Sequence, residues 1–205
     1  MRKTLLLGAI AMALALPTAS QAQFSLGLRV GYAPAMGDYA KDFKLKDEVK
    51  AQIPIQIDGM YKFTPEIAAG LYFSYGFGML NSDVKDQCDA LGVDCSASSM
   101  RLGVQGTYSF TTVSPTFVPW VGAGLGFEWL TEKASLGGVS ASADTTGFEF
   151  LNLQLGGDYK VSNQFYVGPY VLFSLGQYSN VEGQSIPDKG IHQWLHLGVR
   201  GKFDL

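Results

Sequence analysis

The sequence predicts an all-β protein, an eight-stranded antiparallel up-and-down transmembrane β-barrel. Three observations point to this fold. Apolar residues recur at every second position in eight segments, as they do in strands with one apolar and one polar face. The connections between these segments alternate between long and short. After the first 22 residues no apolar run is long enough for a membrane-spanning helix, although 13% of the residues are aromatic.

The last fifteen residues, 191–205, show the alternation most clearly. One face carries Leu195, Leu197, Val199, Phe203 and Leu205, and the other carries histidine, glycine, arginine, lysine and aspartate. The apolar face continues to the C-terminus. A strand that closes a transmembrane barrel needs such an apolar outer band with aromatic residues at its rims.

Residues 1–22 have the features of a cleaved secretory signal peptide. Arg2 and Lys3 give a positive start, residues 5–16 are apolar, and residues 20–22 form a small-x-small cleavage motif. About twelve apolar residues are fewer than the roughly 20 that a membrane anchor needs. We therefore expect export through the periplasm and a barrel domain over residues 23–205.

The charge excludes a nucleic-acid-binding protein, and no cofactor motif is present. The formal charge is −3, and the loss of Arg2 and Lys3 with the leader makes it −5, whereas nucleic-acid binding requires a basic surface. The glycines at 122, 124 and 126 lie on a predicted strand and do not match the spacing of a dinucleotide-binding loop. We expect no nucleic-acid partner and no cofactor.

The eight predicted strands follow from the alternation, and turn-forming residues separate them. The predicted strands are residues 24–32, 53–63, 67–79, 99–110, 117–130, 147–161, 165–177 and 191–205. Long polar connections are predicted at 33–52, 81–97, 131–146 and 178–189. Short turns are predicted at 64–66, 111–116 and 162–164.

The pattern of connections favours an outer-membrane barrel, in which periplasmic turns are short and outer loops are long. An even number of strands places both ends of the barrel domain on the periplasmic side. The alternative is a soluble lipocalin-like barrel with its apolar face inward. The non-apolar faces argue against it, because they combine mid-strand charges with at least ten glycines and large aromatics. Such volume matching suits the narrow interior of an eight-stranded barrel.

The inward charges predict two layers of ion pairs. Counted from the periplasmic end, Arg29, Asp58 and Arg200 lie at one height, and Arg101 and Glu128 lie at a second height on neighbouring strands. An unpaired charge in a filled interior would be costly, so we expect pairing within each layer. A charged constriction that selects ions is the functional alternative.

Cys88 and Cys95 lie in one predicted polar loop with six residues between them. An oxidising compartment favours a disulfide between them. Two cysteines without a nearby histidine make a poor zinc site, so no metal is expected.

His192 and His196 are the only histidines. On a strand, a separation of four residues is roughly 13 Å, too far for both to bind one ion. They are expected to face the lumen near the outer mouth. His192, Ser174 and Glu128 all face inward, as a catalytic set would, but no local motif supports catalysis, and no catalytic residue is predicted.

Outward aromatic residues gather near the predicted strand ends, where they suit the two membrane interfaces. They are Tyr32, Tyr61, Phe63, Phe77, Phe110, Phe127, Trp129, Phe165 and Phe203. The expected partner of this outer face is outer-membrane lipid, including lipopolysaccharide.

Residues 119–127, a Pro-aromatic-x-Gly-x-Gly-x-Gly-aromatic segment, resemble a strand of the outer-membrane β-barrel domain family, which includes small OmpX-like, opacity-type and OmpW-like barrels. Residues 156–159 and 197–203 are similar to its later strands, and the resemblance covers residues 24–205. Members commonly end in phenylalanine, which the barrel-assembly machinery favours. This chain ends in Leu205, which is apolar and in phase.

The resemblance implies a monomeric outer-membrane protein with a filled lumen and a structural, adhesive or surface-interaction role exerted through its outer loops. It also implies contact with the barrel-assembly machinery through the C-terminal strand. Two alternatives remain. The first is a narrow passive channel or a route for small hydrophobic molecules, and the second is a lipid A-modifying enzyme.

Overall fold

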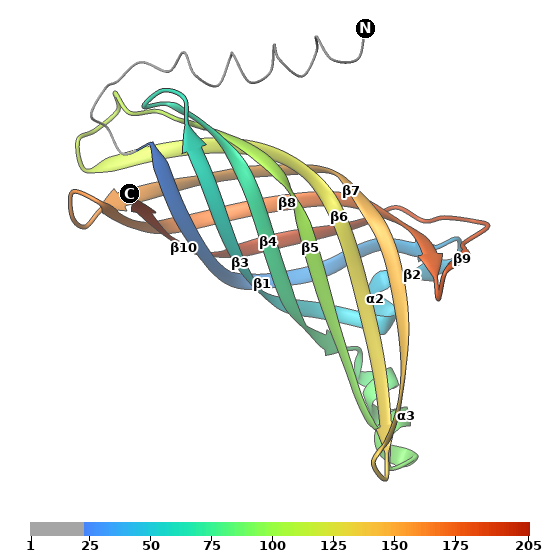
Figure 1. Ribbon diagram of the computed structural model, residues 1–205. Coiled ribbons are helices and arrows are strands. Elements are labelled where there is room, and N and C mark those ends of the chain that lie inside the picture. Colours follow the sequence, from blue (N-terminus) through green and yellow to red (C-terminus); the bar gives the residue numbers. More distant parts are fainter. Residues whose placement is uncertain (1–22) are drawn as a thin grey trace, which may run out of the picture.

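The computed structural model describes residues 23–205, so the predicted signal peptide lies outside the described residues. Eight long strands form a closed barrel, with two short strands and two short helices added at one end (Figure 1). The long strands are β1 (Phe24–Ala40), β3 (Val49–Lys62), β4 (Ile67–Leu80), β5 (Asp94–Ser109), β6 (Phe117–Leu136), β7 (Val139–Lys160), β8 (Phe165–Val181) and β10 (His192–Asp204). The short elements are β2 (Phe43–Lys44), α2 (Leu45–Glu48), α3 (Ser82–Ala90) and β9 (Gln184–Ser185).

The long strands are antiparallel to their neighbours and follow chain order around the barrel. β10 pairs with β8 on one side and with β1 on the other, which closes the ring. At the seam, the Leu205 amide donates to the Phe24 carbonyl at 2.8 Å. The predicted eight-stranded up-and-down barrel is confirmed. None of the helices within residues 23–205 is long and apolar enough to cross a membrane.

The alternating pattern sorts side chains between the outer wall and the lumen. In β1, the outward residues from Phe24 to Tyr32 are 44–57% exposed, whereas inward Ser25 and Arg29 are buried. The same separation continues around the barrel. The apolar side chains therefore face outward, as a wall in contact with lipid requires.

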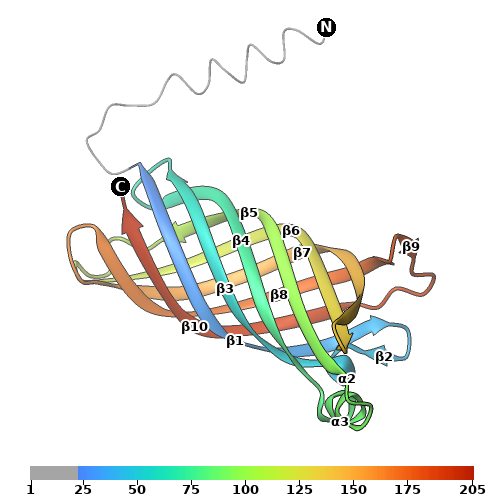
Figure 2. The ribbon, with the colours of Figure 1, turned by 60° about the horizontal axis from the view of Figure 1, so that its bottom comes forward.

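The two ends of the barrel differ. Three short turns, which follow β3, β5 and β7, lie at one end of the barrel (Figures 1 and 2). The C-terminus and the start of β1 lie at the same end, which we call the short-turn end. The helices, β2 and β9 lie at the opposite end, which we call the loop end. The sequence predicted this division from the lengths of the connections.

The predicted long loops contain more regular structure than expected. β1 continues to Ala40, and α3 occupies much of 81–97. The segment 131–146, predicted as a loop, is a β-hairpin whose turn is Gly137-Gly138, both with positive φ. Paired positive φ values give the turn that fits the twist of a hairpin. Outside the hydrocarbon layer a strand needs no apolar face, so large apolar residues no longer recur at every second position in this segment.

An apolar core fills the lumen at the loop end. Its largest members are Leu45, Leu130, Tyr178 and Trp194, which are at most 2% exposed. Leu45 comes from α2, so this short helix contributes to the core. The predicted connection 33–52 is therefore largely ordered and partly buried.

The close packing around one interior glycine, Gly168, leads to a testable prediction. A Cβ atom at Gly168 on β8 would overlap the backbone carbonyl oxygen of Gly157 on β7, whereas a Cβ at outward Gly59 would meet nothing within 4 Å. We expect Gly168→Ala to lower the free energy of unfolding by about 1–3 kcal/mol through overpacking. Gly59→Ala should raise it by about 0.4–1 kcal/mol, because alanine restricts the unfolded chain. Urea titration of the detergent-solubilised barrel measures both, and equal effects would contradict this packing.

Candidate functional site

The first group of lumen charges is centred on Arg29 of β1, which is fully buried. Its Nε lies 3.1 Å from Asp58 Oδ2 on β3, and its Nη1 donates to Gln154 Oε1 on β7 at 2.8 Å. Asp58 also accepts a 2.7 Å hydrogen bond from Gln56. The structure thus brings together Arg29 and Asp58, and the guanidinium reaches across the lumen.

Arg200 of β10 lies directly opposite Arg29 in the strand register. The predicted layer places Arg200 with Asp58, but the two do not pair. The nearest carboxylate to Arg200 is that of Asp158 on β7, at 3.9 Å. Both guanidinium groups lie over the ring of Trp120, at 5.3 Å for Arg29 and 4.5 Å for Arg200. The Trp120 Nε1 donates to Asp158 Oδ1 at 3.0 Å. Trp120 therefore connects both cations to the opposite wall.

The second group contains Arg101 of β5, and the predicted Arg101–Glu128 pair is wrong. The two residues are opposite one another in the register, but Arg101 Nη1 lies 2.9 Å from Glu149 Oε2 on β7. Glu149 also accepts hydrogen bonds from the Tyr72 hydroxyl, at 2.8 Å, and from Asn152. One carboxylate thus collects three donors, which satisfies a buried charge better than a single ion pair does.

A β-bulge explains why the sequence pattern missed Glu149. By strict alternation from outward Leu151, Glu149 would face lipid. The pairing of β7 shifts register between Glu149 and Leu151, and Phe150 and Leu151 are both exposed. A bulge of this kind reverses the faces of the residues that precede it. The signal in the sequence was the pair of consecutive apolar residues, Phe150-Leu151, inside an otherwise alternating strand.

Glu128 pairs with a histidine instead of an arginine. Its Oε1 lies 2.5 Å from His192 Nε2, and the His192 ring stacks on Tyr178 with ring centres 4.1 Å apart. His196 lies separately, with Nδ1 3.5 Å from Arg101. Ser174, the third member of the possible catalytic set, lies opposite Trp194 in the register, one inward position from His192.

Hydrogen bonds connect the Arg29 group to the Arg101 group along the lumen. Gln154, which accepts from Arg29, donates to Asn152 at 2.7 Å, and Asn152 donates to Glu149. Arg29 and Glu149 are 0% exposed. The lumen is therefore filled at the level of both charged groups, in addition to the apolar core at the loop end.

The predicted interface aromatics all lie on the outer wall. Those near the short-turn end include Tyr61 and Phe63, whose ring centres are 5.1 Å apart, and Phe165, which pairs in register with Phe203. Nearer the loop end are Tyr32, Phe77, Phe127 and Trp129, and Phe110 lies beside the short turn after β5.

At the loop end, three strands continue past their neighbours and form what we call the loop-end sheet, residues 94–96, 132–136 and 139–144. β5 pairs with β4 only as far as Ala97, and β7 pairs with β8 only from Thr145. Figure 1 shows this sheet at the bottom of the view, with α3 beside it. The tip side chains Leu136 and Val139 are 57% and 77% exposed.

A disulfide between Cys88 and Cys95 joins α3 to the start of β5, which confirms the predicted bond. Asn81 caps α3 by accepting from the Asp83 amide at 3.1 Å and donates to the Lys46 carbonyl at 2.9 Å. The helix is thus attached both to the loop-end sheet and to α2. Closing a short ring of this kind lowers the entropy of the unfolded chain, which stabilises the folded state by roughly 2–3 kcal/mol.

The solved structure of neisserial surface protein A shares this fold. Neisserial surface protein A is 14% identical, with a TM-score of 0.58 over 91% of this chain and 100% of that chain. Ail, the attachment invasion locus protein of Yersinia pestis, is 15% identical, with a TM-score of 0.48 over 88% and 99%. OprG of Pseudomonas aeruginosa is 15% identical, with a TM-score of 0.45 over 90% and 98%. No curated protein sequence matches the chain.

The sequence also matches a family model, that of the outer membrane protein beta-barrel domain, over residues 4–171. The match covers most of the chain and agrees with the closed eight-stranded barrel and its apolar outer wall. The chain therefore belongs to the outer membrane protein β-barrel domain family.

Proposed function

We propose that this protein is a surface-interaction barrel, in which the transmembrane wall is an anchor and the loop-end sheet makes the functional contacts. The observation that carries the proposal is the free edge of β7 over residues 139–143. This edge continues beyond the last residue paired with β8 and lies at the end expected to face outward. Unpaired strand edges are natural sites for a partner strand.

The backbone groups available at this edge follow from the neighbouring contacts. The Asp144 amide and carbonyl bond to Glu182, on the β8 side. Because backbone direction alternates along a strand, Ser142 and Ser140 direct their amides and carbonyls to the same side. The edge carries small side chains, Val139 to Ala143, so an extended polypeptide can approach it closely.

The filled lumen supports this role over the alternative of a channel. Arg29, Trp120, Glu149 and Trp194 come from four strands and are at most 1% exposed. A passive pore for ions or small hydrophobic molecules needs a continuous path past these levels. We expect the wild-type barrel to give no stable conductance steps in planar bilayers.

The arrangement of three inward residues supports a non-enzymatic role over that of a lipid A-modifying enzyme. These residues are His192, Glu128 and Ser174. Glu128 lies against His192, but Ser174 pairs with Trp194 and not with the histidine position. A nucleophilic serine requires its base within hydrogen-bond reach. The pair is also buried inside the barrel wall, away from the lipid.

The proposal is tested by shortening the loop-end sheet while its turn is kept. Deleting residues 134–136 and 139–141 leaves Gly137-Gly138 between Lys133 and Ser142, which are partners in the present register. We expect bacteria that display the shortened barrel to lose adherence to cultured epithelial monolayers and to surfaces coated with extracellular-matrix protein. Undiminished adherence, with equal amounts of folded barrel in the membrane, would overturn the proposal.

A pair of point variants tests the strand-pairing mode itself. Ser142→Pro removes an amide N–H that is directed to the free edge of β7, and proline is tolerated in an edge strand. Ser142→Val changes the side chain and keeps this N–H. Adherence should fall several-fold for Ser142→Pro and stay unchanged for Ser142→Val. Equal adherence of the two variants would contradict pairing through this edge.

A further inference from the structure

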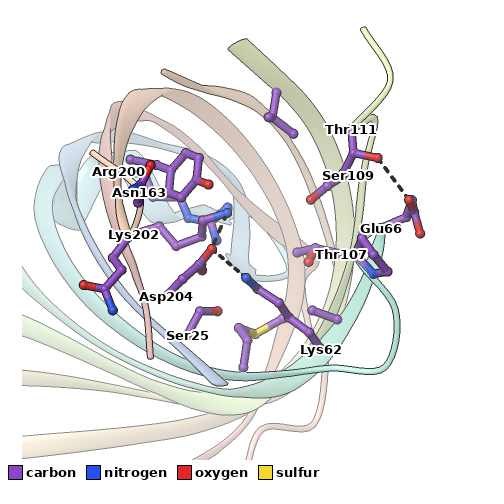
Figure 3. Close-up of a pocket in the computed structure, with 16 residues that line it drawn as sticks. Ser25, Lys62, Glu66, Thr107, Ser109, Thr111, Asn163, Arg200, Lys202 and Asp204 are labelled. Atoms are coloured by element: carbon purple, nitrogen blue, oxygen red, sulfur yellow. Dashed lines mark hydrogen bonds and ion pairs between the residues drawn. The ribbon is translucent and has the colours of Figure 1, made fainter. Parts of the chain in front are cut away.

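A cavity of about 370 Å³ opens at the short-turn end of the barrel, and we call it the vestibule. Figure 3 shows its walls, with Arg200 and Lys202 on one side, Ser109 and Thr107 on the other, and Lys62 between them. The basic residues are Lys62 on β3 and Arg200 and Lys202 on β10, and Ser109 and Thr107 come from β5. The volume lies at the lower end of the range for small-molecule sites.

Arg200 faces the vestibule with hydrogen-bonding capacity that the protein does not use. The residue is 4% exposed, and its Nε has no hydrogen-bond partner. The 3.9 Å separation from Asp158 is too long for a hydrogen bond, and Asp158 Oδ1 already accepts from Trp120. Burying an unsatisfied charged donor is costly, so the site is incomplete without an acceptor.

The two lysines add positive charge around the same space. Lys62 makes a close pair with Asp204, at 2.6 Å. Lys202 lies over the Tyr166 ring, 3.5 Å from Asp158 and 4.0 Å from Asp204. Asp158 Oδ2 is thus shared by Arg200 and Lys202. Within this cluster three cations face two carboxylates, so the cluster itself has one positive charge in excess.

A third carboxylate, Glu66, lies on the rim and is held apart from the cations. It accepts hydrogen bonds of 3.0 Å from Thr111 and from Thr64, and these bonds lower the pKa of its carboxyl group below the ordinary value. In Figure 3 it lies beside Thr111, across the cavity from Arg200. An exposed charge in this position is screened by solvent and salt.

We propose that the vestibule binds a phosphate ester, with Arg200 and Lys202 as its anion-binding groups. A guanidinium presents a fork of donors that matches the oxygens of a phosphate, and the neighbouring ammonium adds a compact charge. The hydroxyl wall suits the polar part of a small phosphate ester. At the short-turn end, which is expected to face the periplasm, a soluble phosphate ester or the phosphoglycerol headgroup of an inner-leaflet lipid supplies this chemistry.

The test follows the Arg200 Nε–H signal by NMR in the complete mature chain, in phosphate-free buffer. In one arm, glycerol 3-phosphate is titrated into the protein in maltoside micelles. In the other, nanodiscs of phosphatidylglycerol are compared with nanodiscs of phosphatidylcholine. A saturable shift with glycerol 3-phosphate identifies a soluble ligand, and a shift only in phosphatidylglycerol identifies a headgroup. Either shift supports the proposal, and no shift in both arms overturns it.

Two variants with the same change in charge separate a site from a general charge effect. Lys202→Gln removes a vestibule cation that is only partly buried, so the barrel is expected to fold. Lys160→Gln removes an exposed cation at the same end, outside the vestibule. We expect affinity about tenfold weaker for Lys202→Gln, as for one lost charge-assisted contact, and unchanged for Lys160→Gln. Equal affinities of the two variants would overturn the proposal.

Discussion

Replacing Glu149 with alanine is expected to destabilise the barrel by about 3–5 kcal/mol, because the change leaves the Arg101 guanidinium buried without its carboxylate. Arg101 is 2% exposed and makes its 2.9 Å ion pair with this residue. Arginine cannot release its proton, so the charge stays in the lumen. Tyr72 and Asn152 lose an acceptor at the same time. Urea titration in lipid vesicles, followed by tryptophan fluorescence, measures the change.

Glu128→Ala is the matched control, since it removes a buried glutamate from the strand position opposite Arg101. Its contact is with His192, so the change leaves no guanidinium buried without a carboxylate, and the loss should be about 1 kcal/mol, the order of one polar contact. The sequence alone predicts the opposite order, with Glu128 as the partner of Arg101. Greater destabilisation by Glu128→Ala than by Glu149→Ala would show that the sequence prediction is correct and the observed pairing is not.

The transmembrane wall could be predicted because lipid imposes one rule on it. Each outward position within the hydrocarbon layer must be apolar, so residues such as Leu28 and Leu102 reveal both the strand and its phase. The rule ends where the lipid ends. Residues 139–144 continue β7 with Ser140 and Ser142 on one face and Ala141 and Ala143 on the other, and these small side chains do not mark an apolar band although the strand persists. Ala33 and Ala35 likewise continue β1 with small apolar side chains inward.

The pairing inside the lumen could be predicted only where two strands stay in simple register. Arg29 and Asp58 lie on neighbouring strands at nearly equal heights, and they meet. Arg200 and Arg101 find their carboxylates, Asp158 and Glu149, on β7, which is not adjacent to either of their strands. Contacts across a narrow lumen depend on strand tilt and on bulges. Counting residues from one end of each strand gives neither the strand tilt nor the positions of the bulges.

The filled lumen consists of three levels with different chemistry. Arg29, Arg200 and Trp120 form the level nearest the vestibule, Arg101 and Glu149 form the middle level, and apolar residues form the level at the loop end. Each level draws residues from opposite walls. Side-chain contacts in the lumen thus connect opposite walls of the barrel at three levels. Loss of one level is expected to lower the stability of the protein without opening a path through the other two.

Trp120→Ala is the second variant with a large expected effect, because this side chain is 1% exposed and contacts two cations and a carboxylate. Removing a buried tryptophan side chain should cost about 3–5 kcal/mol. The loss includes the contacts of Arg29 and Arg200 with the ring and the 3.0 Å hydrogen bond to Asp158. Trp129→Ala, which truncates an outward and partly exposed ring, should cost much less.

The same variant separates a structural lumen from a gated channel. If the three levels close the barrel independently, Trp120→Ala should lower stability in the urea titration and still show no conductance steps in planar bilayers, because Glu149 and Trp194 stay in place. Phenylalanine at position 120 keeps most of the ring and loses only the Asp158 hydrogen bond, so it should recover the larger part of the lost stability. Stable conductance steps in Trp120→Ala, absent in the wild type, would instead identify Trp120 as the gate of a channel.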